Sequence, residues 1–186
     1  MKKTITELRP VIISLFIFTI LCGVLYTGVI TGISQIFFHN KANASIITVS
    51  LNDGTDMKIG SELIAQEFTK KEYMIGRPLG TSNLSPTSEK LRQEVEERIR
   101  WWHAFDPGNT DDIPIDLIYA SGSGVDPNIS VEAAKYQVKR IAKARGIEEK
   151  MVEDIISKYT TERLLGIFGE RTVNVLKVNL ALDEKL

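Results

Sequence analysis

The chain has 186 residues, of which 25% are charged and 43% are apolar, a balance typical of one ordinary folded domain. This composition excludes a disordered chain and a fibrous repeat. The formal net charge of -1, without a dense Lys and Arg cluster, excludes a nucleic-acid partner.

The first structural feature is a long apolar segment near the N-terminus. Residues 11–38 contain no Asp, Glu, Lys or Arg, and about 20 such residues suffice to cross a bilayer. We predict a transmembrane helix over residues 11–34, a juxtamembrane linker over 35–44 and one domain over 45–186. The helix would also contact membrane lipid.

Three alternatives to a permanent anchor are less consistent with this segment. A buried core helix of this length without a polar face is unusual in so small a domain. A cleaved signal peptide fits Ala42-Asn43-Ala44, but its apolar region would be about twice the usual length. Lipidation of Cys22 is disfavoured because Leu21 precedes it where a small residue is needed.

Basic residues beside the apolar segment predict its orientation. Lys2, Lys3 and Arg9 precede it, whereas Lys41 alone closely follows it. Cytoplasmic flanks carry the excess of Lys and Arg. We therefore expect residues 1–10 to be cytoplasmic and the chain to be a single-pass cell-membrane protein with an extracytoplasmic domain.

The domain begins with a predicted strand, a tight turn and a short helix. Residues 45–51 are rich in β-branched side chains and lead into Asn52-Asp53-Gly54, which is typical of a strand followed by a tight turn. A helix is predicted over residues 60–68 with Ser61 as its cap. A short apolar segment, residues 73–75, follows and ends at Gly76-Arg77-Pro78.

A longer helix and a second strand are predicted in the middle of the domain. Ser85-Pro86 is typical of a helix start, and an apolar stripe with helical spacing follows it. Trp102 continues this stripe, whereas Trp101 is either exposed, which favours a protein or membrane interface, or half-buried in the core. Residues 106–109 break the helix, and residues 113–119 are predicted to form a strand. The stripe consists of Leu91, Val95, Ile99 and Trp102.

The C-terminal part is predicted to contain two helices and a strand. Ser130 is the expected cap of a helix that runs to Arg145 and ends at Gly146. Residues 151–159 indicate another helix, and residues 172–182 alternate like a strand. The fold class is therefore α+β: one N-terminal transmembrane helix, followed by a single mixed α+β soluble domain.

Catalytic motifs are missing from the sequence. There is no phosphate-binding loop and no His-Glu-x-x-His, and a single Cys excludes a thiolate metal site. We predict no catalytic residue and no metal site. His39 and His103 are interpreted as interface or packing residues.

One loop is a candidate functional segment: Ser121, Gly122, Ser123, Gly124 and, just after them, Asp126. A serine between a strand and a helix raises the alternative of a membrane-anchored extracytoplasmic serine hydrolase, although the Gly-x-Ser-x-Gly spacing is missing. An anion-binding loop and a plain turn are two further interpretations.

Several strings resemble the C subunit of the bacterial Kdp-type potassium-transporting P-type ATPase, in the family's order across nearly the whole chain. The most specific is Ala-Ser-Gly-Ser-Gly-x-Asp-Pro, at residues 120–127. The others lie at residues 41–46, 60–66, 76–78, 82–87, 116–130, 137–146 and 173–180. Asn128, where the family often has His, and residues 101–109 depart from the pattern.

The resemblance implies a non-catalytic accessory subunit of a high-affinity, ATP-driven potassium uptake complex. Its implied partners are a potassium-binding channel-like subunit, a catalytic P-type ATPase subunit and a small membrane peptide. It also implies that the chain raises the ATP affinity of the catalytic subunit, with Gln137 as an ATP contact. ATP is the one cofactor implied, and only through that subunit.

This implied nucleotide contact conflicts with the predicted orientation, because ATP is cytoplasmic and Gln137 would lie outside. An outward domain would instead stabilise the assembly or cover the potassium entrance. An anchored solute-binding module is the remaining alternative to these functions.

Overall fold

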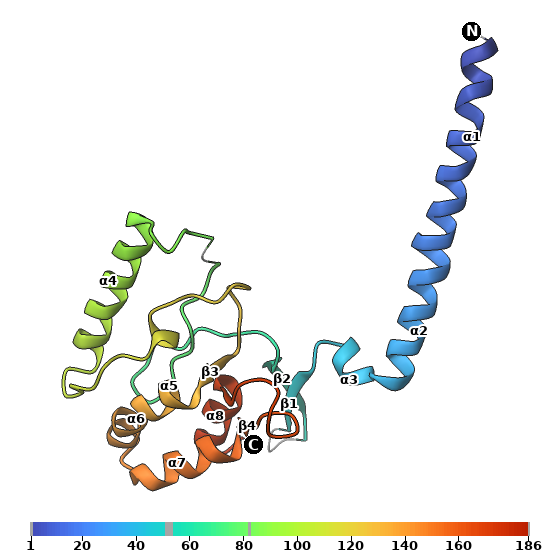
Figure 1. The fold of residues 1–186 in the computed structure, drawn as a ribbon. Coiled ribbons are helices and arrows are strands. Elements are labelled where there is room, and N and C mark those ends of the chain that lie inside the picture. The colour runs from blue at the N-terminus through green and yellow to red at the C-terminus, as the bar shows by residue number, and fades with distance from the viewer. Residues whose placement is uncertain (1, 51–53, 82, 186) are drawn as a thin grey trace. The chain divides into compact units, whose positions relative to one another are not determined.

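The structure is a computed structural model that describes residues 2–50, 54–81 and 83–185. It forms two compact units, Met1–Ser45 and Ile46–Leu186 (Figure 1). The first unit is helical, and the second contains helices and two small sheets. The predicted α+β fold class is confirmed.

The N-terminal unit is a long apolar helix with an irregular middle. It consists of α1 (Lys2–Phe18), a π-helical stretch η1 (Thr19–Tyr26) and α2 (Thr27–Phe37). Its stretch Leu8–Phe37 has 30 residues and a mean hydropathy of 2.3, and none of its most apolar window is buried within the molecule. At about 1.5 Å per residue this exceeds a hydrocarbon core of about 30 Å. A short helix, α3 (His39–Ala42), follows within the predicted linker.

Three hydroxyl groups in this helix donate to backbone carbonyls of the helix itself. Thr19 Oγ1 donates to the Leu15 carbonyl at 2.8 Å, and Ser14 Oγ donates to the Val11 carbonyl at 2.9 Å. Thr27 Oγ1 reaches the Cys22 carbonyl, five residues back, at 3.0 Å. A hydrocarbon environment offers no water to polar groups, so this internal pairing suits a membrane-spanning helix.

The second unit begins with a hairpin, of which the sequence predicts the first strand and the turn but not the second strand. Strand β1 (Ile46–Ser50) pairs antiparallel with β2 (Asp56–Ser61), and the register shifts between Ile47 and Thr48. The first strand is thereby confirmed. Residues 52 and 53 of the predicted turn lie outside the described residues, whereas Gly54 has φ +81°.

The helix predicted over residues 60–68 is wrong. Its first residues belong to β2, and the Ser61 hydroxyl accepts a hydrogen bond from the Leu63 amide at 3.0 Å, which makes a turn. Leu63 and Ile64 are 52% and 49% exposed. Their spacing suggests an amphipathic face, but neither residue is buried by the rest of the domain.

Helix α4 (Glu89–Phe105) carries the predicted stripe on the core side. It starts later than expected, because Ser85-Pro86 lies in a preceding turn and Ser88 occupies the N-cap position. Trp102 is 1% exposed and donates its indole N–H to the Leu117 carbonyl at 3.1 Å, while Trp101 is 43% exposed. Of the two interpretations of Trp101, the structure supports the exposed one.

The strand predicted over residues 113–119 is also wrong. The structure has a single 3-10 turn there, η2 (Ile115–Leu117), whose Leu117 amide donates to the Pro114 carbonyl at 3.0 Å. Pro114 lacks an amide hydrogen for a sheet ladder, which disfavours a strand through this segment.

The two helices predicted after Ser130 are present. The Ser130 hydroxyl accepts the Ala133 amide at 3.1 Å, and Gly146 ends the helical run with φ +67°. The predicted first helix is interrupted at Gln137. The helices are α5 (Val131–Tyr136), α6 (Val138–Arg145) and α7 (Glu149–Lys158).

A small antiparallel sheet and a central helix complete the domain. The strand order is β3 (Asn128–Ser130), β5 (Thr172–Asn174) and β4 (Thr160–Thr161). The strand predicted over 172–182 is right for its first three residues only, because α8 (Val175–Leu182) follows. Asn174 caps α8 by accepting the Lys177 amide at 3.1 Å.

Helix α8 packs against α7 and β5 inside the domain (Figure 1). It is buried on most sides and lacks the polar face that reveals an amphipathic helix. The most deeply buried apolar residues of the domain core are Met74, Trp102, Leu117, Ile129, Ala133, Ala134, Ile141, Val152, Val173 and Val178.

Candidate functional site

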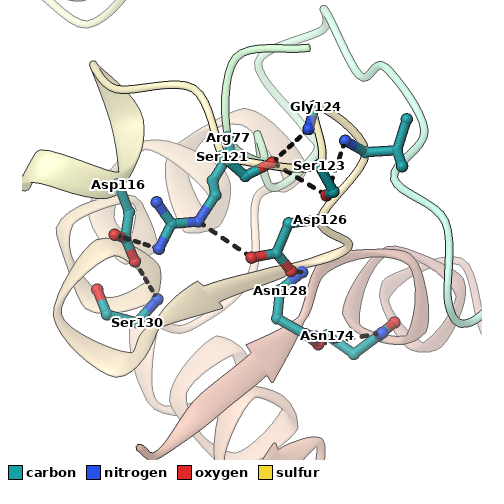
Figure 2. Close-up of polar contacts among 10 residues, drawn as sticks. Arg77, Asp116, Ser121, Ser123, Gly124, Asp126, Asn128, Ser130 and Asn174 are labelled. Carbon is teal, nitrogen blue, oxygen red and sulfur yellow. Dashed lines mark hydrogen bonds and ion pairs between the residues drawn. The ribbon is translucent and has the colours of Figure 1, made fainter. Parts of the chain in front are cut away.

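Arg77 lies between two carboxylates that come from separate segments. Its Nη2 atom is 2.5 Å from Asp116 Oδ1, and its Nε atom is 3.5 Å from Asp126 Oδ2 (Figure 2). The Arg77 and Asp116 side chains are 24% and 14% exposed. Because the pair is partly buried, water and salt screen its attraction less than they screen that of a surface pair.

Both carboxylates also accept backbone hydrogen bonds at the start of β3 and α5. Asp116 Oδ2 accepts the Ser130 amide at 2.6 Å, and Asp126 Oδ1 accepts the Asn128 amide at 3.0 Å (Figure 2). The Arg77 cluster, meaning Arg77, Asp116 and Asp126, therefore joins the turn after residue 75, η2 and the beginning of β3. Asp126 of the predicted functional loop belongs to it.

The Ser-Gly-Ser-Gly loop is folded by its own hydroxyl groups. Ser121 Oγ accepts the Gly124 amide at 2.9 Å, and Ser123 Oγ accepts the Val125 amide at 3.3 Å. The two hydroxyl oxygens are 3.3 Å apart. These contacts are turn contacts, and a general base would have to come from elsewhere for hydrolysis.

Gly124 is required where it stands. It has φ +73°, and a Cβ there would lie 2.6 Å from the Gly80 carbonyl carbon and 2.7 Å from the Thr81 nitrogen. The Gly80 amide donates to the Gly124 carbonyl at 3.0 Å. The loop thus lies directly against residues 80 and 81, which only a residue without a side chain allows.

Gln137 lies in the domain core with no exposed surface. Its Oε1 atom accepts the Ile75 amide at 2.8 Å and the Arg140 Nη2 group at 2.6 Å. Its Nε2 atom donates to the Ile75 carbonyl at 2.9 Å and to the Ala133 carbonyl at 3.1 Å. The ATP contact implied for Gln137 stays a prediction.

Asn179 of α8 makes the same kind of pair with the neighbouring residue. Its Oδ1 atom accepts the Met74 amide at 2.7 Å, and its Nδ2 atom donates to the Met74 carbonyl at 2.9 Å. Side-chain amides thus satisfy backbone groups that a strand partner would otherwise satisfy. Sequence reasoning missed Asn179, although a lone amide within the apolar run of residues 175–182 is a usable signal.

Two arginines hold the residues just before this segment. Arg140 is 5% exposed and donates through Nη1 to the carbonyl oxygens of Lys71 and Tyr73, the latter at 3.0 Å. Burial lowers the pKa of Arg140 to about 10. Arg145 donates to the Glu72 carbonyl at 2.7 Å and pairs with Asp183 at 2.8 Å.

Tyr73 completes this arrangement. Its hydroxyl donates to Asp183 Oδ2 at 3.0 Å, and its ring lies 5.0 Å from the Arg145 guanidinium carbon. The hydrogen bond to Asp183, followed by burial, raises the pKa of Tyr73 above its usual value of 10.0. Residues 71–75 are thus held by Gln137 and by side chains from α6, α8 and the C-terminal segment.

Two clefts flank the held segment. One of about 240 Å³ includes Arg77, Arg98 and the exposed face of Trp101. Another of about 480 Å³ includes Lys71 and Arg140. Within the described part of the chain, no group of three or more His, Cys, Asp or Glu residues is suited to hold a metal ion.

Comparison with known proteins gives one consistent result. Residues 8–184 match the family described as "KdpC: K+-transporting ATPase, c chain". The chain is 53% identical to the potassium-transporting ATPase KdpC subunit of Listeria monocytogenes serovar 1/2a, over 98% of each chain. It is 48% identical to the KdpC subunit of Clostridium perfringens, covering 95% of this chain and 96% of that one.

The match includes the apolar helix, the Arg77 cluster, Gln137 and Asn179 within one continuous stretch. Because it covers nearly the whole chain, the family extends to both structural units. The chain therefore belongs to the KdpC family, the c chain of K+-transporting ATPases.

Proposed function

We propose that this chain is a non-catalytic accessory subunit that a high-affinity, ATP-driven potassium uptake complex needs for assembly or activity. Its relatives are named as subunits of a potassium-transporting ATPase. The single observation that carries the proposal is the family match over residues 8–184. Its partners are the channel-like potassium-binding subunit, the catalytic P-type subunit and the small membrane peptide of that complex.

The chain's own polar groups support a binding role rather than a chemical one. The polar side chains of Gln137, Asn179 and Arg77 form their hydrogen bonds and ion pairs with other residues of the same domain. Such buried, paired polar groups rigidify a domain. A rigid domain tethered by an apolar helix is suited to binding other subunits.

The apolar helix anchors the chain in the cell membrane, and we place the domain on the extracytoplasmic side. The support is the excess of Lys2, Lys3 and Arg9 before the helix. In this arrangement the domain stabilises the assembly or covers the potassium entrance. Any effect on ATP affinity then passes through the catalytic subunit, and Gln137 acts by positioning Ile75.

Growth on limiting potassium tests this proposal. A strain that carries the rest of the complex but lacks this chain should fail to grow at micromolar potassium, and the wild-type chain should restore growth. The chain with residues 11–34 deleted serves as the control for anchoring and should not restore it. Normal growth without the chain would contradict the proposed role.

A further inference from the structure

The loop between β4 and β5 exposes four large apolar side chains at one tip. Leu164, Leu165, Ile167 and Phe168 are 70%, 81%, 74% and 63% exposed. We name these four residues the apolar tip. Exposed apolar groups of this density mark an interaction site more often than single surface residues do.

The tip has a defined backbone structure. The Leu164 amide donates to the Phe168 carbonyl at 2.8 Å, and the Phe168 amide donates to the Leu164 carbonyl at 3.0 Å. Leu165, Gly166 and Gly169 have φ values of +54°, +75° and +85°. A leucine in the left-handed region is unfavourable, and here the conformation presents its side chain outward.

Charged residues on both sides of the tip pair with each other. Arg163 Nη2 lies 3.0 Å from Glu170 Oε2, and Arg171 Nη2 lies 2.7 Å from Glu162 Oε1. The rim therefore has two cations and two anions and a formal charge of zero. A polar rim around an apolar centre is the general arrangement of a protein–protein interface.

A lipid surface fits this rim less well. Segments that lie on membranes are rich in Lys and Arg and often carry interfacial Trp or Tyr. The rim has no excess of cations, and the tip has neither Trp nor Tyr. Charge therefore favours a protein over anionic lipid as the occupant.

We propose that the apolar tip binds an apolar pocket, bordered by charges of both signs, on another subunit of the ATPase complex. The inference rests on the proposed function, since it needs a partner subunit. The exposed Leu165 at the centre of the tip is the expected anchor residue, and the two ion pairs form the border of the contact.

Copurification of the intact complex from membranes, through a tag on this chain, tests the proposal. The test variant is Leu165→Asp with Ile167→Asp, because Asp tolerates the left-handed region and both side chains are exposed in the free chain. The control is Met151→Asp, at a 54% exposed position in the first turn of α7. Unchanged thermal unfolding of both purified variants excludes misfolding.

The tip variant should weaken the contact about tenfold or more, as loss of a central anchor does, and so lose its partners in dilute detergent while the control retains them. A photoreactive residue at 165 should crosslink to one subunit. Equal recovery with both variants, or crosslinks to lipid alone, would overturn the inference while leaving the subunit role intact. Failure of the wild-type chain to copurify any partner would instead overturn the proposed function.

Discussion

Gln137 binds the backbone of Ile75 in both directions, accepting its amide at 2.8 Å and donating to its carbonyl at 2.9 Å. Asn179 repeats this pairing on Met74. Two side chains, one at the junction of α5 and α6 and one in α8, thus replace the neighbouring strand that an extended segment normally needs. The buried amides explain how residues 74 and 75 stay inside the domain without being part of a sheet.

Replacing Gln137 with Leu should destabilise the domain strongly. The change leaves the Ile75 amide and carbonyl without partners in the core, and such losses cost about 2–4 kcal/mol in total. Urea unfolding of the full chain in detergent, followed by tryptophan fluorescence, measures it, because both tryptophans lie in the domain. Gln93→Ala on the exposed face of α4 is the control, and an equal midpoint for the two variants would show that the Gln137 pairing contributes little.

The coupling free energy between Arg77 and Asp116 should be larger than that of an ion pair on the surface. A double-mutant cycle with Arg77→Met and Asp116→Asn should give a coupling of about 1–3 kcal/mol, because the pair is partly buried and lies within a hydrogen-bonded network. The same cycle on the exposed pair of Arg92 and Glu89 should give about 0.5 kcal/mol or less. Similar values for both cycles would contradict a structural role for the Arg77 cluster.

Alkaline pH should remove the contribution of the Tyr73 hydroxyl to the free energy of unfolding. Its pKa is raised in the folded chain by the hydrogen bond to Asp183, so the folded state retains the proton longer than the unfolded state. The resulting stability is fully present below the unfolded pKa of 10.0 and is lost as pH rises through the folded pKa.

Unfolding midpoints of the wild type and Tyr73→Phe should therefore converge as pH rises from about 9 to about 11. The comparison between two chains cancels the shifts that they share, including the raised pKa of Tyr136 and the lowered pKa of Arg140. A constant difference across this range would mean that the Tyr73 proton does not stabilise the fold.

Thiol labelling should place the domain outside the cytoplasm. Cys22 is the one cysteine of the chain, so Cys22→Ala provides a clean background for Lys150→Cys at a side chain that is 78% exposed. An impermeant reagent should label this cysteine in intact spheroplasts. A cysteine at position 3 is the control for the opposite side, and labelling of Lys150→Cys only after lysis would reverse the proposed orientation.

The sequence predicts those elements whose signals are local. Ser130 and Gly146 set the limits of the helical run that contains α5 and α6, and the stripe through Leu91 and Trp102 locates α4, because caps and helical periodicity act within a few residues. The long apolar helix is the most direct prediction, since length and the lack of charge suffice for it.

The wrong predictions have a common cause in tertiary context. Helix α8 alternates in sequence like a strand, yet the domain buries most of its sides, so periodicity could not separate the two structures. The helix predicted over residues 60–68 has a suitable cap in Ser61, but the domain leaves Leu63 and Ile64 of its apolar face exposed. The pairing of Asn179 with Met74, residues far apart in the sequence, depends on the completed fold.

The sequence likewise predicts only part of the candidate site. The loop from Ser121 to Gly124 is evident from its composition, and the structure accounts for it by local turns and by the close approach of Gly124 to Gly80. The ion pairs of Arg77 with Asp116 and Asp126 could not be predicted, because separate segments supply the three side chains and only the tertiary fold brings them together. Family resemblance alone points to Gln137.

Potassium-stimulated ATP hydrolysis, measured in membranes that contain the other subunits of the complex with and without this chain, tests whether the chain is a required accessory subunit. We predict little potassium-stimulated hydrolysis without the chain and recovery when the full-length wild-type chain is coexpressed. Full stimulation in membranes without the chain would contradict its role as a required accessory subunit.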